Sequence, residues 1–432
     1  METGGGAKVF AETLAKKIRG RKGAQVLTAA GGTAIFFSDS TNPVLIGPVF
    51  KPLSDKMKVS REKLAYIVDA TSATMPSMFF FTAWGAYILN ILQQQLEIIG
   101  VEKNGIIAFN EAVPFMFYTI GAVIFVYFIA VTGFDYGPMM KAEKRAQEEG
   151  KLVADGDATE KLLRTVEIPE GATPKLSSML VPIAVLVIVI FAGLLWTGGF
   201  PKVGIGEAMA NAASTKSLVV AFFVASIVAA CYTIKDKVYT VKEAIGAFMT
   251  GIGQMMETCC ILVLAWSIGS VCTAVGTTNY VISITEGFLT PAMMYVVLFL
   301  VCALTAFCTG TSWGTFAIYL PISVPLAAAI GAPIAPAVGL VVSGGIFGDH
   351  CSPISDTTIM SSAGAQCYHI NHVNTQIPYA LTVSAVSVVC YVIAGFVKNA
   401  AISLIIAFAL MFLTLLVLRR IFGVEEKEKE EA

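Results

Sequence analysis

The sequence predicts an all-α polytopic membrane protein with about ten to twelve membrane segments, some of them broken or re-entrant. Hydrophobic residues make up 56% of the chain and charged residues 14%, whereas soluble domains carry about 25% charged residues. The mean hydropathy is +0.74. We therefore expect the lipid bilayer to surround most of the chain, and the net charge of -1 gives no indication of nucleic-acid binding.

Residues 24–50 predict a re-entrant helical hairpin. They lie between two basic clusters that end and begin at Lys22 and Lys51, and basic clusters favour the cytoplasmic side. These 27 residues are too few for two crossings of about 20 residues each. The polar run 38–43 (SDSTNP) is placed at the turn. The alternative is a single broken span, which would put one basic cluster outside.

The remaining apolar stretches divide the chain into two halves. Residues 1–134 are interpreted as the first half of the membrane part and 177–420 as the second, joined by a polar cytoplasmic linker, 135–176. The charged end, 421–432, predicts a cytoplasmic tail. We expect a multi-pass protein of the cell membrane with its N-terminus, linker and C-terminus in the cytoplasm. Clear spans lie at 177–198, 217–234, 289–308, 377–397 and 400–418, and longer interrupted ones at 64–97, 105–133, 244–283 and 313–366.

Two short motifs occur in both halves. Residues 82–87 (TAWGAY) resemble 311–316 (TSWGTF), and 38–41 (SDST) resemble 355–358 (SDTT). Interrupted apolar segments at corresponding positions of two halves indicate a transport site near the bilayer midplane. The order of the motifs is swapped between the halves, so a simple duplication does not follow.

The stretch from 243 to 397 contains acids but no basic side chain. It runs 155 residues between Lys242 and Lys398 without lysine or arginine. A carboxylate in hydrocarbon needs a partner, which here must come from elsewhere in the chain or be a proton or a metal cation. The acids of this stretch are Glu243, Glu257, Glu286, Asp349 and Asp356.

Asp349 and Asp356 lie in one polar run, 348–358 (GDHCSPISDTT). Pro353 and the hydroxyl residues predict an unwound segment, and hard cations prefer oxygen ligands. Burial raises the pKa of a carboxylate and a bound cation lowers it, so one site can exchange a proton for Na+. The alternative role for both acids is to cap a half-helix. The hydroxyl ligands expected around them are Ser352, Ser355, Thr357 and Thr358.

Four further residues are candidate ion or substrate ligands. Asp39 lies at the predicted hairpin turn, where turn capping is the alternative. Asp69 lies in a polar break, where a salt bridge with Arg61 or Lys63 is the alternative. Thr311 and Ser312 lie at a glycine-containing joint between two apolar runs, where close helix packing is the alternative. The four are Asp39, Asp69, Thr311 and Ser312.

The histidines suggest a competing reading. His350 follows Asp349, and His369 and His372 are three residues apart, so a membrane metalloenzyme is a remote alternative. The metalloprotease motif His-Glu-x-x-His is missing from the sequence. We expect His369 and His372 at the membrane interface, and we expect a carrier with no resident cofactor or metal.

These motifs resemble the NhaC family of sodium/proton antiporters. The resemblance rests on residues 60–69, 309–315 and 344–358 and covers nearly the whole chain. It implies inverted repeats with broken helices and hairpins, and exchange of external protons for internal sodium. Some relatives couple Na+ or H+ to malate, lactate or amino acids.

The leading hypothesis is therefore a secondary active transporter that exchanges Na+ for H+ through midplane carboxylates. Li+ or a small organic acid is a further candidate substrate, and an organic-anion or amino-acid antiporter on the same scaffold is the alternative. A homodimer is left open. Two departures from the resemblance stand out: relatives often carry two acids where this chain has Ser38 and Asp39, and Met1 falls close to the motif at Gly4. The first leaves the coupling ratio open, and the second suggests a shortened or split transporter.

Overall fold

Helices are the only regular elements in the part of the chain that the computed structural model describes, residues 9, 13, 20–36, 39–154, 172–205, 208, 211–275, 290–397 and 399–422. Eight helical segments in this part are long and apolar enough to cross a membrane, which confirms the all-α polytopic class. The other expected segments correspond to broken elements between residues 21 and 98 and to α13 (Val241–Ala274). The eight spans are Phe117–Glu149, Ser177–Thr197, Lys216–Lys235, Pro291–Thr309, Ser312–Ala329, Ile334–Cys351, His369–Ala394 and Ala400–Phe422.

The first hairpin is formed by α2 (Arg21–Ala34) and α3 (Thr41–Lys56). A Cβ added to Gly31 would lie 3.0 Å from the Phe50 ring, so the Phe50 ring of α3 packs directly against the backbone of α2. Near the turn, the Asn42 amide donates to the Gly32 carbonyl at 2.9 Å. The chain thus folds back on itself within 24–50, as the spacing of the basic clusters predicts.

A broken span follows the first hairpin. It consists of α4 (Arg61–Ser72), the single turn α5 (Thr74–Ser77) and α6 (Ala83–Ile98). The Ser60 side chain caps α4 by accepting from the Lys63 amide, and the Thr82 side chain caps α6 by accepting from the Gly85 amide at 3.0 Å. Such caps satisfy amide groups that have no partner within the helix. The interruption at 78–82 therefore ends in a stabilised helix N-terminus.

The same order occurs again in the second half. A hairpin of α15 (Pro291–Thr309) and α16 (Ser312–Ala329) turns at Gly310, whose φ of 68° is left-handed. The broken span α17 (Ile334–Cys351) and α18 (Asp356–Ala365) follows it. Pro353 lies in the interruption, where it cannot donate a helical hydrogen bond.

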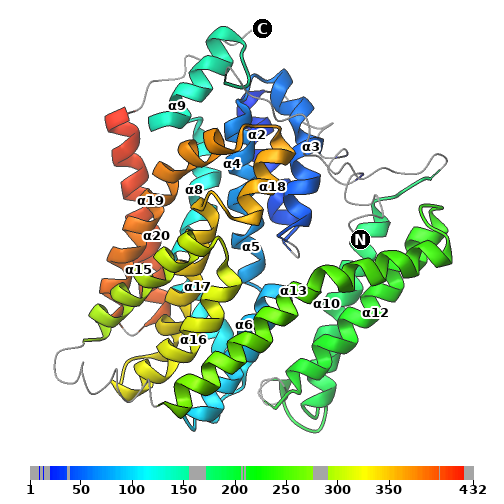
Figure 1. Ribbon diagram of the computed structural model, residues 1–432, viewed down its shortest axis with the longest axis vertical. Coiled ribbons are helices and arrows are strands. Elements are labelled where there is room, and N and C mark those ends of the chain that lie inside the picture. The colour runs from blue at the N-terminus through cyan, green and yellow to red at the C-terminus, as the bar shows by residue number, and fades with distance from the viewer. Residues whose placement is uncertain are drawn as a thin grey trace.

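The two hairpins lie at opposite ends of the molecule. In Figure 1, α2 and α3 lie at one end together with α18, and α16 lies at the other end together with α6. Each hairpin therefore packs against the second half of the other repeat's broken span. At one of these contacts a Cβ on Gly47 would lie 2.5 Å from the Gly364 carbonyl carbon. The arrangement is that of two inverted repeats.

This packing accounts for the swapped motifs. The two TAWG-like motifs begin α6 and α16, which pack together, and the SDST and SDTT motifs meet the starts of α3 and α18, which also pack together. The repeated motifs thus belong to helices that touch across the repeats. They do not belong to topologically equivalent helices.

Outside this core, α10 (Ser177–Thr197) and α12 (Ser214–Lys235) pack as a pair that lies to one side in Figure 1. Their exposed apolar side chains, including Trp196 at 82%, are typical of a lipid-facing surface. Part of the expected linker is helical, as α9 (Gly137–Lys144) and the π-helix η3 (Arg145–Glu149). The described residues stop at 154 and resume at 172, so residues 155–171 of the linker, Ser38, Glu286 and the tail from 423 lie outside them, as does the Glu257 side chain.

Candidate ion-binding site

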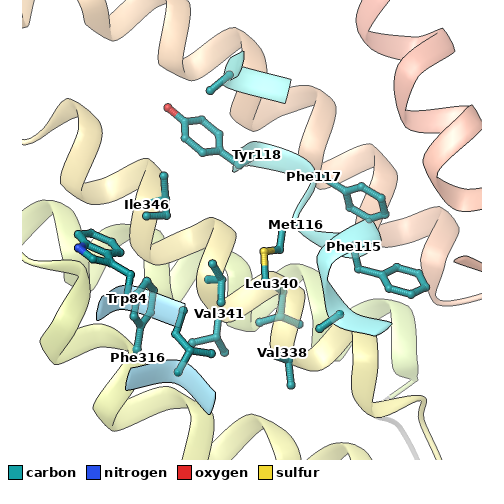
Figure 2. Close-up of a cluster of buried hydrophobic side chains, with 14 of the residues drawn as sticks. Trp84, Phe115, Met116, Phe117, Tyr118, Phe316, Val338, Leu340, Val341 and Ile346 are labelled. Atoms are coloured by element: carbon teal, nitrogen blue, oxygen red, sulfur yellow. The ribbon is translucent and has the colours of Figure 1, made fainter. Parts of the chain in front are cut away.

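Four helix N-termini, those of α3, α6, α16 and α18, meet where the two hairpin turns and the interruptions of the two broken spans face one another. The Trp84 indole of α6 donates to Asp39 Oδ2 at 3.0 Å. The Trp84 and Trp313 rings lie with centroids 5.1 Å apart, and the Tyr87 hydroxyl donates to the Trp313 carbonyl at 3.0 Å. Figure 2 shows Trp84 and Phe316 in one apolar cluster with α17 side chains. We call the polar groups at this meeting point the central cluster. Its residues are Asp39, Trp84, Thr311, Ser312, Asp349, Ser352, Ser355, Asp356, Thr357 and Thr358.

Asp349 is the acid at the centre of this cluster. Its side chain is buried, with 2% of the residue exposed. One carboxylate oxygen accepts from the Ser355 hydroxyl at 2.5 Å, and the other accepts from the Ser312 hydroxyl. The carboxylate therefore joins the N-terminus of α16 to the N-terminus of α18, which stabilise its negative charge.

The other hydroxyl residues of the run surround Asp349. Ser352 donates to the Phe307 carbonyl at 2.7 Å, Thr358 donates to the Asp349 carbonyl at 3.4 Å, and Thr357 shares a hydrogen bond with Ser355 at 3.0 Å. All four predicted hydroxyl residues have no exposed surface. The structure thus brings them together around one buried carboxylate.

Asp356, Asp39 and Thr311 occupy the rim of the cluster. Asp356 is exposed at the start of α18, and its carboxylate accepts from the Thr357 amide at 2.8 Å. Asp39 is half-buried and accepts from the Ser40 amide at 2.8 Å. Thr311 is the half-buried N-cap residue of α16. The N-cap residues of α3 and α18 are Ser40 and Ser355, and within the described residues neither helix has a side-chain cap hydrogen bond, so each acid contacts its helix start through the amide of the next residue.

Asp69 is held by a different set of partners. It is fully buried, and its carboxylate accepts from Gln376 at 2.9 Å and faces His372 Nε2 at 3.2 Å. A salt bridge with Arg61 or Lys63 is not formed, because Arg61 pairs with Asp55 and Lys63 pairs with Asp135. The side chains that take this place, His372 and Gln376, are four residues apart and share one face of α19 (His369–Ala394).

His372 is enclosed by the protein. The side chain has no exposed surface, and its expected place at the membrane interface stays a prediction. His369, which is half-buried, faces the Pro353 carbonyl at 2.6 Å and the Ser362 hydroxyl at 3.1 Å. The polar spacing of His372 and Gln376 just before the apolar run 377–397 is the signal that could have placed them inside.

The metalloenzyme alternative gains no support from this geometry. His350 shares a hydrogen bond with the Tyr118 hydroxyl at 2.8 Å, and His369 and His372 have the separate partners given above. Across the described ranges, no three His, Cys, Asp or Glu side chains form a group that could hold a metal ion.

Comparison with known proteins identifies the family of the chain. The sequence model of the Na+/H+ antiporter family matches residues 77–396, which is well over half of the chain. This chain belongs to that family. The matched range contains the second half of the broken span α4–α6 and every residue of the central cluster from Trp84 onward.

Relatives of this antiporter-family chain extend the match. An uncharacterized protein of Haemophilus influenzae is 36% identical over 400 residues, which cover 91% of the chain and 75% of that protein. A malate-2H+/Na+-lactate antiporter of Bacillus subtilis is 25% identical over 158 residues, 37% of the chain and 34% of that protein. The chain therefore spans about a third of the second relative.

A solved structure resembles the fold of this family member. The YdaH transporter of Alcanivorax borkumensis covers 91% of the chain and 81% of its own length, with a TM-score of 0.51 and 13% identity. At this identity the likeness concerns the fold alone. The family is one of antiporters, and eight helical segments of the described residues are long and apolar enough to cross a membrane, so the chain is a multi-pass membrane protein of a transporter family.

Proposed function

We propose that this protein exchanges Na+ for H+ across the cell membrane. The observation that carries the proposal is the buried Asp349 carboxylate, which two serine hydroxyls hold at the junction of a hairpin and a broken span. The sequence from 243 to 397 offers it no basic partner. A carboxylate in this setting accepts either a proton or a small cation.

The surrounding groups are suited to a hard cation. Hydroxyl and carbonyl oxygens are preferred by such ions, and the C-terminal ends of α15 and α17 present backbone carbonyls at the two interruptions. We propose Asp349 as the central ligand, with Asp39 and Asp356 at the rim. The other proposed ligands are Thr311, Ser312, Ser352, Ser355, Thr357 and Thr358.

The proposal predicts a direct ion response. In proteoliposomes with an imposed pH gradient and an internal pH dye, added Na+ should dissipate the gradient without an organic acid. Li+ tests selectivity, and K+ is the control for nonspecific leak. The same vesicles receive malate or lactate in a separate arm. Flux that appears only with an organic acid would contradict plain Na+/H+ exchange.

One observation favours an organic-anion exchanger as the second candidate. Four helix N-termini meet at the central cluster, and such termini hold carboxylates without basic side chains. A relative is named as a malate/lactate antiporter. The organic-acid arm of the flux experiment separates the two candidates.

The inverted repeats also predict which side each hairpin faces. Cysteines placed at the exposed positions Gly20 and Lys56 flank the first hairpin, so both should react with an impermeant maleimide from the cytoplasm. A cysteine at Ala329, at the end of the second hairpin, should react from the outside. Labelling of positions 20 and 56 from opposite sides would replace the hairpin by a single span.

A further inference from the structure

A second buried acid lies outside the central cluster and faces a histidine. Asp69 of α4 and His372 of α19 are both fully buried, with 3.2 Å between Oδ2 and Nε2. Gln376 donates to the same carboxylate oxygen at 2.9 Å, and Ser361 of α18 donates to the other at 3.3 Å. Three helices from both repeats therefore meet at this one carboxylate.

The pair has room for one more proton. The Nε2 nitrogen of His372 faces the carboxylate, and its Nδ1 nitrogen is buried without a hydrogen-bond partner among the residues that the structure describes. With neutral His372 the pair carries one negative charge. A proton taken up at Nδ1 makes an imidazolium beside a carboxylate, and the pair becomes neutral, which suits an apolar setting.

The nearby basic side chains do not take the place of this proton beside Asp69. Because the basic side chains of α4, and Arg21 of the neighbouring α2, are already in ion pairs, they do not neutralise Asp69. Those pairs are Arg21 with Glu143, Arg61 with Asp55 and Lys63 with Asp135. The other titratable groups with an electrostatic interaction with Asp69 are Tyr66 of α4, Tyr118 of α8 (Phe117–Thr132), and Asp349, His350 and Cys351 of α17. Asp356 begins α18, and His369 and Tyr379 lie on α19.

A short connection leads from the pair to the central cluster. The Gln376 amide that donates to Asp69 also donates to the backbone carbonyl of His350, the residue next to Asp349. A cation bound at Asp349 would add a positive charge close to the imidazolium and disfavour it. The connection gives cation binding and proton release a common physical basis.

We propose that the Asp69–His372 pair carries the transported proton, at a site separate from the cation site at Asp349. This inference rests on the proposed Na+/H+ exchange. It assigns the two substrates of that exchange to two neighbouring carboxylates, and Asp69 is then a proton carrier outside the set of cation ligands.

The test separates cation movement from proton coupling. His372→Gln keeps an amide that can donate to Asp69 but cannot be protonated. In proteoliposomes of the full chain, exchange of radioactive Na+ for Na+ at equal pH should stay within about threefold of wild type. Na+-driven proton flux should fall by about tenfold or more, and its dependence on pH should flatten. His369→Gln is the matched control and should retain both activities.

Asp69→Asn is the second variant, because it removes the same pair from the other side. Normal proton flux with an unchanged pH profile in either variant would overturn the inference. Loss of Na+/Na+ exchange together with proton flux, or failure of both variants to reach the membrane, would make the pair structural and overturn it too. A wild type that moves no protons with Na+ would instead disprove the proposed function.

Discussion

Asp349→Asn is expected to reduce Na+-driven proton flux to background, a loss of about a hundredfold or more. Asparagine keeps the shape of the side chain: its oxygen can accept from one of the two hydroxyls of Ser312 and Ser355, and its amide group can donate to the other. It offers no charge to a cation. Transport should therefore be lost while the hairpin and broken span remain joined. Flux at several pH values, with Na+ binding to the purified protein, measures both consequences.

The chain offers a matched control for this substitution. Asp236 is also buried and also accepts from a serine hydroxyl, that of Ser178, but it lies on the α10–α12 pair away from the central cluster. Asp236→Asn should leave flux within about twofold of wild type. Asp356→Asn should have an intermediate effect, because that acid is exposed at the rim. Robust exchange by folded Asp349→Asn would move the site to Asp39 or Asp356.

Gly85→Ala is expected to have the second large effect. A Cβ at Gly85 would lie 1.9 Å from the Phe79 carbonyl oxygen, so the interruption before α6 would have to move. Forced overpacking of this kind costs about 1–3 kcal/mol and sometimes more. Because Trp84 contacts both Asp39 and Trp313, the movement would reach the central cluster. We expect flux to fall by about tenfold or more and the unfolding temperature in detergent to decrease.

Gly314→Ala is the comparison, since Gly314 holds the corresponding place in the repeated motif. The nearest group to a Cβ there would be the Thr311 methyl at 3.5 Å, an ordinary contact. Alanine also favours a helix by about 1 kcal/mol over glycine. The variant should transport normally and be as stable as wild type or more so. An equal loss of flux and stability in both variants would mean that the glycine has the same role in both motifs. The different contacts at Gly85 and Gly314 argue against that.

Residues close together in the sequence are enough to predict the fold class, the first hairpin and the interruption before α18. Hydropathy alone predicts the all-α membrane class, because a bilayer leaves an apolar chain few ways to satisfy its backbone. The short interval between two basic clusters predicts the first hairpin, and Pro353 with its neighbouring hydroxyls predicts the interruption between α17 and α18. The same run places hydroxyl residues around Asp349. Each of these inferences depends on residues close together in the sequence.

Only the tertiary structure decided how the acids differ. Asp349 is buried and Asp356 exposed although they are neighbours in one run, because α16 of the second hairpin covers the first with Ser312. Asp69 meets His372 from a helix about three hundred residues away, and its nearer basic residues pair with other acids. Which side chains become partners depends on which helices pack together. Hydropathy does not predict that packing, because it is nearly the same for every helix in a bilayer. Only the packing of α3 against α18 and of α6 against α16 explains the swapped order of the motifs.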